Sequence, residues 1–107
     1  KGGTAIYSAL MTAYEIAEKQ KRTYPDRYYS IVLLSDGKNE SKIEYKTFEK
    51  YYKQLPPELQ EIKTFTILFG NANTEEMHKV AELTGGRVFD GQQKSLASVF
   101  KKIRGYQ

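Results

Sequence analysis

Hydrophobic and polar residues alternate along this chain with two different periods, and the switches between them predict helices and strands in turn. Residues 4–20 carry apolar side chains at helical spacing, on a face made of Ile6, Leu10, Ala13, Tyr14 and Ala17. The next apolar run, from Ile31 to Leu34, is short and continuous, which is typical of a strand covered on both faces. A helix followed by such a strand begins an α/β pattern.

The same two periods continue through the middle of the chain. A second amphipathic helix is predicted from its apolar residues Phe48, Tyr51, Tyr52 and Leu55. Thr47 is the predicted N-cap of this helix, and Pro56-Pro57 is its predicted stop. The strand predicted next, residues 64–69, is rich in β-branched and aromatic residues and is closed by Gly70.

Two more helices and a strand are predicted in the last third of the chain. Asn73 and Glu76 form a predicted capping box for a third helix, which the glycine pair at residues 85–86 ends. Residues 87–89 then form a third, short strand. Ser95 is the predicted cap of a last helix, whose apolar residues are Leu96, Val99, Phe100 and Ile103.

Strands that alternate with helices imply right-handed crossovers and a parallel sheet. We therefore expect an α/β fold of three layers, with a mostly parallel sheet, helices on both faces, and about three strands and four helices. The sequence contains no repeat, low-complexity tract or linker, so residues 1–107 are expected to form one domain.

The composition of the chain argues against several kinds of binding partner and metal site. No apolar run approaches the roughly 20 residues of a membrane helix, so no direct membrane insertion is expected. The absence of cysteine excludes disulfides and thiolate metal sites. The net charge is +4, but the basic clusters lie near the ends of predicted helices, where they complement the helix dipole. Because no contiguous aromatic and basic strand face accompanies them, no nucleic-acid partner is expected.

A hydroxyl and a carboxylate are placed to meet at one end of the predicted sheet. Thr4 stands where the first helix opens, and Asp36 follows the strand that ends at Ser35. In an open α/β sheet both positions face the crevice at the carboxyl edge of the strands. Hard oxygens that converge there suggest a divalent cation. Taken singly, Thr4 is better explained as a helix cap and Asp36 as an Asx turn.

These residues also carry a resemblance to a known family. Gly-Gly-Thr-Ala-Ile-Tyr at residues 2–7 and Leu-Leu-Ser-Asp-Gly at residues 33–37 resemble the second and third motifs of the metal-ion-dependent adhesion site of von Willebrand factor A domains. Residues 64–70 and 81–89 resemble later strands and the Gly-Gly turn of that family, and bacterial members are the most similar. The family's opening strand, with its Asp-x-Ser-x-Ser motif, is not found, so the chain is expected to be a single partial domain, the C-terminal portion.

The resemblance implies a function and a site. Thr4 and Asp36 would contact Mg²⁺ or Mn²⁺ directly or through water, and Ser35 would orient the site. The module would be non-enzymatic and would bind a partner protein whose acidic side chain completes the coordination, at the cell surface or outside the cytoplasm. Magnesium takes about six oxygens, and this chain supplies at most two, so its own affinity is expected to be millimolar or weaker.

Two alternatives remain open. The first is an α/β phosphoryl-transfer or hydrolase domain that uses Asp36, which would need a second carboxylate at the end of a neighbouring strand. Phe69-Gly70-Asn71 supplies none. The second is a purely structural fragment with no active metal site. His78, the one histidine, has no motif partner and is expected to be structural or solvated.

The strand from Ile31 to Ser35 is expected to lie at an open edge, because the family's opening strand lies beside it. The run contains no lysine, proline or other residue that commonly blocks edge pairing. We therefore expect either a homodimer through this edge, or an exchange of the first helix between copies, or a partner segment that covers the strand.

Overall fold

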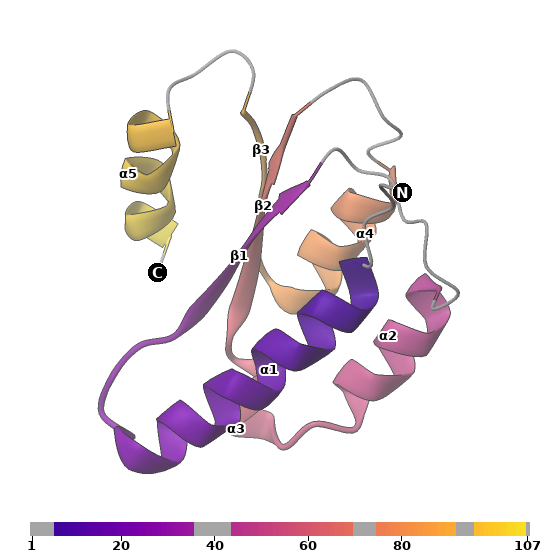
Figure 1. Cartoon of the computed structure of the whole chain (residues 1–107), viewed down its shortest axis with the longest axis vertical. Helices are drawn as coiled ribbons and strands as arrows, with labels where there is room; N and C mark the ends of the chain where they lie inside the picture. The colour runs from indigo at the N-terminus through magenta and orange to yellow at the C-terminus, as the bar shows by residue number, and fades with distance from the viewer. Residues whose placement is uncertain (1–5, 36–43, 70–74, 92–95, 107) are drawn as a thin grey trace.

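A computed structural model describes residues 6–35, 44–69, 75–91 and 96–106. Its sheet has three parallel strands, β1 (Ser30–Ser35), β2 (Lys63–Leu68) and β3 (Val88–Asp90), in the order β1-β2-β3. Figure 1 shows this sheet between helices on both faces. The predicted α/β architecture with a parallel sheet is confirmed.

Five helices accompany the sheet in the described part of the chain: α1 (Ile6–Thr23), α2 (Tyr45–Lys53), α3 (Pro57–Gln60), α4 (Glu75–Thr84) and α5 (Leu96–Tyr106). In Figure 1, α5 alone lies on one side of the strands, and α1, α2 and α4 lie on the other. None of these helices is both long and apolar enough to cross a membrane.

The two prolines have a role beyond the one predicted for them. The second helix does end before Pro56, at Lys53, but Pro57 then begins the additional short helix α3. Proline is well suited to the first position of a helix, because its fixed φ angle fits and its missing N–H would have no partner there. Leu59 on this turn is buried and joins the core.

The predicted cap of the second helix is wrong. Thr47 lies inside α2, which begins at Tyr45 after Glu44. The backbone carbonyl of Glu44 accepts the N–H groups of Thr47 and Phe48, so the helix starts without a side-chain cap. The other predicted caps, Asn73 and Ser95, lie outside the described residues.

The core on the larger helical side of the sheet is centred on aromatic rings. Phe48 of α2 is fully buried, and its ring centroid lies 5.8 Å from that of Tyr7 and 6.2 Å from that of Tyr14, both on α1. The Tyr52 ring lies 6.3 Å from Phe48. These contacts attach α2 to α1, and α1 packs on the sheet.

The core on the other side of the sheet is smaller. Val99 and Ile103 of α5 pack on Phe65 and Ile67 of β2. Phe100, which was expected on the same helical face, has 39% of its surface exposed. Successive residues of a helix are about 100° apart around its axis. Phe100 therefore lies at the margin of the buried face that contains Val99.

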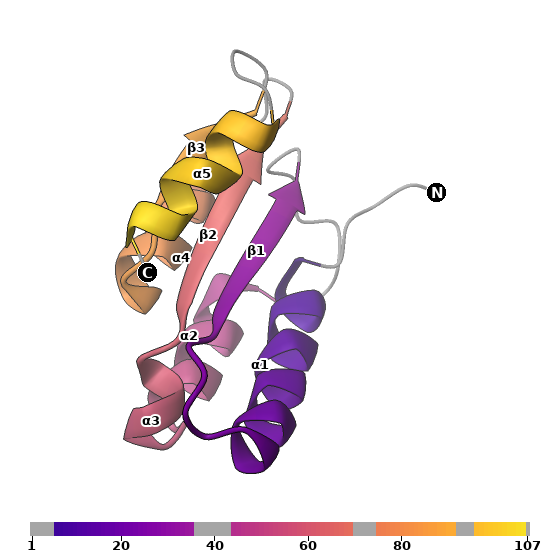
Figure 2. The ribbon, with the colours of Figure 1, turned by 90° about the vertical axis from the view of Figure 1, so that its left-hand side faces the viewer.

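The expectation that the first strand is covered on both faces is wrong. Ile31 and Ser35 are buried on the α1 side, but Leu34, which points to the α5 side, is 48% exposed. Figure 2 shows the reason, because α5 lies over β2 and β3 and leaves the outer strand open.

The glycine pair ends α4, as predicted. Gly85 has a φ of +75°, in the left-handed region that glycine adopts without strain, and the N–H of Gly86 donates to the carbonyl of Ala81. Gly86 then lies directly against the backbone of Thr64 on β2. This close approach places the chain beside β2 two residues before β3 begins.

Candidate functional site

The carboxyl ends of the strands lie at one edge of the sheet. The register aligns Ser35 with Leu68, and Leu68 with Asp90. The backbone carbonyl of Ser35 accepts the N–H of Phe69 at 2.9 Å, so the ladder between β1 and β2 extends one residue past the end of β2. This edge is where ligands bind in open α/β sheets.

Only one of the three predicted site residues is described. Ser35 is the last residue of β1 and is 6% exposed, on the α1 side of the sheet. Thr4 and Asp36 lie outside the described residues. The elements next to them are described, since β1 ends one residue before Asp36 and α1 begins two residues after Thr4.

The N-terminal ends of α1, α2 and α4 lie toward the same edge (Figure 1). Two contacts of one tyrosine hold these ends together. The Tyr7 hydroxyl, on the first turn of α1, donates to Glu76 Oε1 on the first turn of α4. The Tyr7 ring also makes an edge contact with Tyr45, the first residue of α2, at 6.2 Å between centroids.

Sequence reasoning missed this contact. The sequence predicts only a capping role for Glu76, whose box with Asn73 lies partly outside the described residues, and the Glu76 carboxylate also accepts the hydroxyl of Tyr7. The sequence did offer one indication that Tyr7 is buried. It follows Ile6 directly, at the start of the apolar face of the helix. The partner of Tyr7 was not visible, because the two residues are 69 positions apart.

Burial governs the ionisation of the two tyrosines on the apolar face of α1. Burial raises the pKa of Tyr7 well above its ordinary value, and the hydrogen bond and charge of Glu76 raise it further. Burial also raises the pKa of Tyr14, whose hydroxyl donates to the carbonyl of Ile62 at 3.0 Å and lies 3.1 Å from Thr64 Oγ1. Both hydroxyls therefore stay protonated in the folded chain.

The stability of the fold should fall above pH 10. Unfolded tyrosine ionises near pH 10, whereas folded Tyr7 and Tyr14 keep their protons, so the folded state binds more protons than the unfolded state at higher pH. Each such tyrosine should lower the free energy of unfolding by about 1 kcal/mol between pH 10 and pH 11. Urea unfolding at pH 8, 10 and 11 measures this loss.

Tyr7→Phe is the matched variant for this measurement. It should lose about 1 kcal/mol less than the natural chain between pH 10 and 11, because one of the proton-retaining groups is gone. Identical pH profiles for the two chains would show that Tyr7 ionises as readily in the folded state as in the unfolded state.

One carboxylate at the carboxyl edge was also missed. The third strand was predicted to end at residue 89, whereas it includes Asp90, which is exposed. Asp90 is two strands from Ser35, a separation of about 10 Å at the usual strand spacing. The neighbouring strand β2 ends in Leu68, followed by Phe69, so the described part of that strand supplies no carboxylate beside the end of β1.

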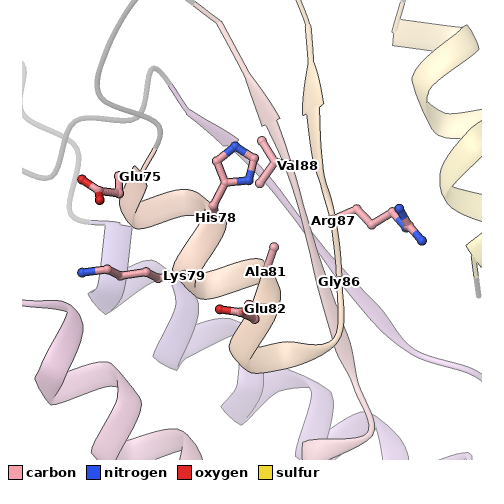
Figure 3. Close-up of a pocket in the computed structure, with 8 residues that line it drawn as sticks. All are labelled: Glu75, His78, Lys79, Ala81, Glu82, Gly86, Arg87 and Val88. Atoms are coloured by element: carbon pink, nitrogen blue, oxygen red, sulfur yellow. The ribbon is translucent and has the colours of Figure 1, made fainter.

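A surface pocket of about 560 Å³ lies between α4 and the start of β3 (Figure 3). His78, Glu82 and Arg87 line it and are all exposed. Figure 3 shows Arg87 extending away from His78, and its guanidinium lies 4.1 Å from the centroid of the Tyr106 ring. The Arg87 guanidinium and the His78 ring therefore do not converge on a common point in this pocket.

The described residues also bring no group of three or more histidine, aspartate or glutamate side chains into metal-binding proximity. Thr4 and Asp36, on which the predicted cation site depends, lie outside the described residues. Comparisons of the chain with protein-family models, curated proteins and solved structures found no match.

Proposed function

We propose that this chain is a non-enzymatic binding module of the von Willebrand A type, which holds Mg²⁺ or Mn²⁺ at the carboxyl edge of its sheet and binds a protein partner there. One observation carries the proposal. The two elements that adjoin the predicted ligands, the end of β1 and the start of α1, lie toward the same edge of a parallel α/β sheet (Figure 1).

The chemistry of the donor set fits a hard cation. Thr4 offers a hydroxyl and Asp36 a carboxylate, the oxygen ligands that Mg²⁺ prefers. Ser35, which precedes Asp36 in the sequence, is buried and would orient the site. An acidic side chain of the partner protein would supply a further anionic oxygen, so binding of the partner would depend on the metal.

The proposal is tested with Mn²⁺ alone, because a paramagnetic ion reports weak binding by broadening nearby NMR signals. In a millimolar titration of the ¹⁵N-labelled chain, the amide signals of Ser35 and Phe69 should broaden first. Signals at the opposite end of the sheet, such as those of Arg27 and Glu58, should stay sharp. Excess Mg²⁺ should reverse the effect.

Asp36→Ala should abolish this broadening, because it removes the anionic ligand. Asp26→Ala removes the same group from the turn between α1 and β1, at the other end of the strands, and should leave the broadening unchanged. Persistent broadening at Ser35 in the Asp36→Ala variant would remove Asp36 from the site. Broadening centred on Asp90 instead would place the cation on the wrong strand for this family.

A further inference from the structure

Five basic side chains gather around the C-terminal end of α5. Three belong to the helix itself, and all three are exposed: Lys101, Lys102 and Arg104. The other two come from the amino ends of β2 and β3. The Lys63 ammonium donates to the backbone carbonyl of Tyr106 at 2.8 Å, and the Arg87 guanidinium lies 4.1 Å from the centroid of the Tyr106 ring. Figure 3 shows the Arg87 side chain extending toward α5. These five residues form the basic patch.

Acidic side chains do not offset the charge of the basic patch. Helix α5 contains no aspartate or glutamate. Glu61 precedes β2 but lines a pocket with Lys21 of α1. Asp90 lies at the carboxyl end of β3, whereas the patch lies at the amino end of that strand. Among the described residues, none of the five cations forms an ion pair.

Helix α2 provides a contrast, because it also presents three exposed basic residues: Lys46, Lys50 and Lys53. There the charge is partly balanced within the same helix. The Lys53 ammonium lies 3.3 Å from a carboxylate oxygen of Glu49, and Glu44 precedes the first residue of the helix. The excess of positive charge is therefore concentrated around α5.

The helix dipole accounts for a small part of this charge. The C-terminal end of a helix is equivalent to about half a negative charge, so a single cation is enough to compensate it. The Lys63 ammonium, which binds a carbonyl of the last turn, already fills this role. The other four cations are left to solvent ions or to an anionic partner.

Two partly exposed aromatic side chains flank the basic patch. Phe100 lies one helical turn before Arg104, and Tyr106 stacks with Arg87. Helix α5 lies alone on its side of the sheet, so within the described chain no other helix covers its outer face (Figures 1 and 2). Basic side chains beside exposed aromatic rings are typical of helices that lie on anionic lipid surfaces, where the rings sit among the headgroups.

We propose that the basic patch binds an anionic membrane surface, with α5 lying against the lipid headgroups without crossing the bilayer. The five cations come from three elements and spread over the end of a convex helix, so a broad layer of phosphate groups can meet them together. A single-stranded nucleic acid would also need a series of free rings for its bases. The ring of Tyr106 is already stacked with Arg87.

The binding should depend strongly on salt. Each lysine or arginine close to an anionic bilayer strengthens the attraction about fivefold. This attraction decays within the Debye length, which falls from about 10 Å at 0.1 M salt to about 3 Å at 1 M. The chain should therefore bind anionic lipid in dilute buffer and be released at about 1 M salt.

The test is co-sedimentation of the full chain with lipid vesicles in the presence of EDTA. One set of vesicles contains phosphatidylcholine and phosphatidylglycerol in equal parts, and the other contains phosphatidylcholine alone. The chain should sediment with the first set and stay in solution with the second. Because EDTA removes divalent cations, the result does not depend on the proposed cation site.

A triple variant addresses the patch directly by combining Lys101→Gln, Lys102→Gln and Arg104→Gln. It should lower partitioning onto the anionic vesicles about a hundredfold, since it removes three cations. The matched control combines Lys46→Gln, Lys50→Gln and Lys53→Gln on α2, which removes the same charge from exposed positions. It should lower partitioning by no more than about fivefold. Glutamine is a good helix former, and circular dichroism checks that both variants are folded.

Three results would overturn the proposal. The first is equal binding to both kinds of vesicle, and the second is an equal loss of binding in the two triple variants. The third is retention on polyglutamate or single-stranded DNA by a chain that does not sediment with the anionic vesicles, because a soluble polyanion would then be the ligand. The Mn²⁺ titration is independent of all three results.

Discussion

Gly86→Ala should lower the free energy of unfolding by more than about 3 kcal/mol, a large share of the stability of a domain of this size. A Cβ at this position would lie 1.8 Å from the carbonyl oxygen of Thr64 and 2.6 Å from its carbonyl carbon. Both atoms belong to the backbone of the central strand β2, which cannot move away without disturbing the parallel ladder on both sides. Any movement that relieves the clash would therefore destabilise the sheet.

Denaturant unfolding followed by circular dichroism measures this effect. Gly105→Ala is the control, because a Cβ there meets nothing within 4 Å and lies in α5. It should leave stability unchanged or raise it by up to about 1 kcal/mol, since alanine is the better helix former. Equal stabilities for Gly86→Ala and the natural chain would mean that the turn and β2 are further apart than the structure places them.

Phe48→Ala should cost about 3–5 kcal/mol, the usual range for removing a buried phenylalanine side chain. Phe48 is fully buried, and four tyrosine rings lie around it at centroid distances of 5.8 to 6.4 Å. These rings come from α1 and from α2 itself, so truncation leaves a cavity between two helices that both need the contact.

Phe100→Ala provides the same chemical change at a residue that is 39% exposed, and it should cost less than about 1.5 kcal/mol. The comparison uses urea unfolding at pH 7. A loss below about 1 kcal/mol for Phe48→Ala would contradict a tightly packed aromatic core, and a loss in Phe100→Ala as large as that in Phe48→Ala would contradict the exposure of Phe100.

Local patterns were sufficient to predict most of the architecture. The apolar face of α1 and the β-branched strand around Thr64 to Leu68 have the periods that their structures require, so their types followed from the sequence. The short helix α3 did not, because four residues carry no period and its signal, Pro57, also fits a helix stop. The start of α2 was missed because a backbone carbonyl, and not Thr47, receives the first N–H groups.

The sequence predicted where the strands lie, but it did not predict which of their faces the helices cover. An apolar run such as Ile31 to Leu34 indicates a parallel strand, but which faces are covered depends on the position of α5, more than 60 residues later in the sequence. The candidate site has the same limitation. Order along the chain suggested that Thr4 and Asp36 converge, whereas the link between Tyr7 and Glu76 and the position of Asp90 depend on long-range packing.

The attachment of α2 has a consequence for the order in which the fold assembles. This helix has nine residues and no side-chain cap, so it is too short to persist alone in water. It is held by rings from α1 and by the Lys79 ammonium of α4, which lies 5.7 Å from the centroid of the Tyr45 ring. We therefore expect α2 to form only once α1 and α4 have docked on the sheet. A change that loosens α1 or α4 should therefore also loosen α2 and expose the aromatic core around Phe48.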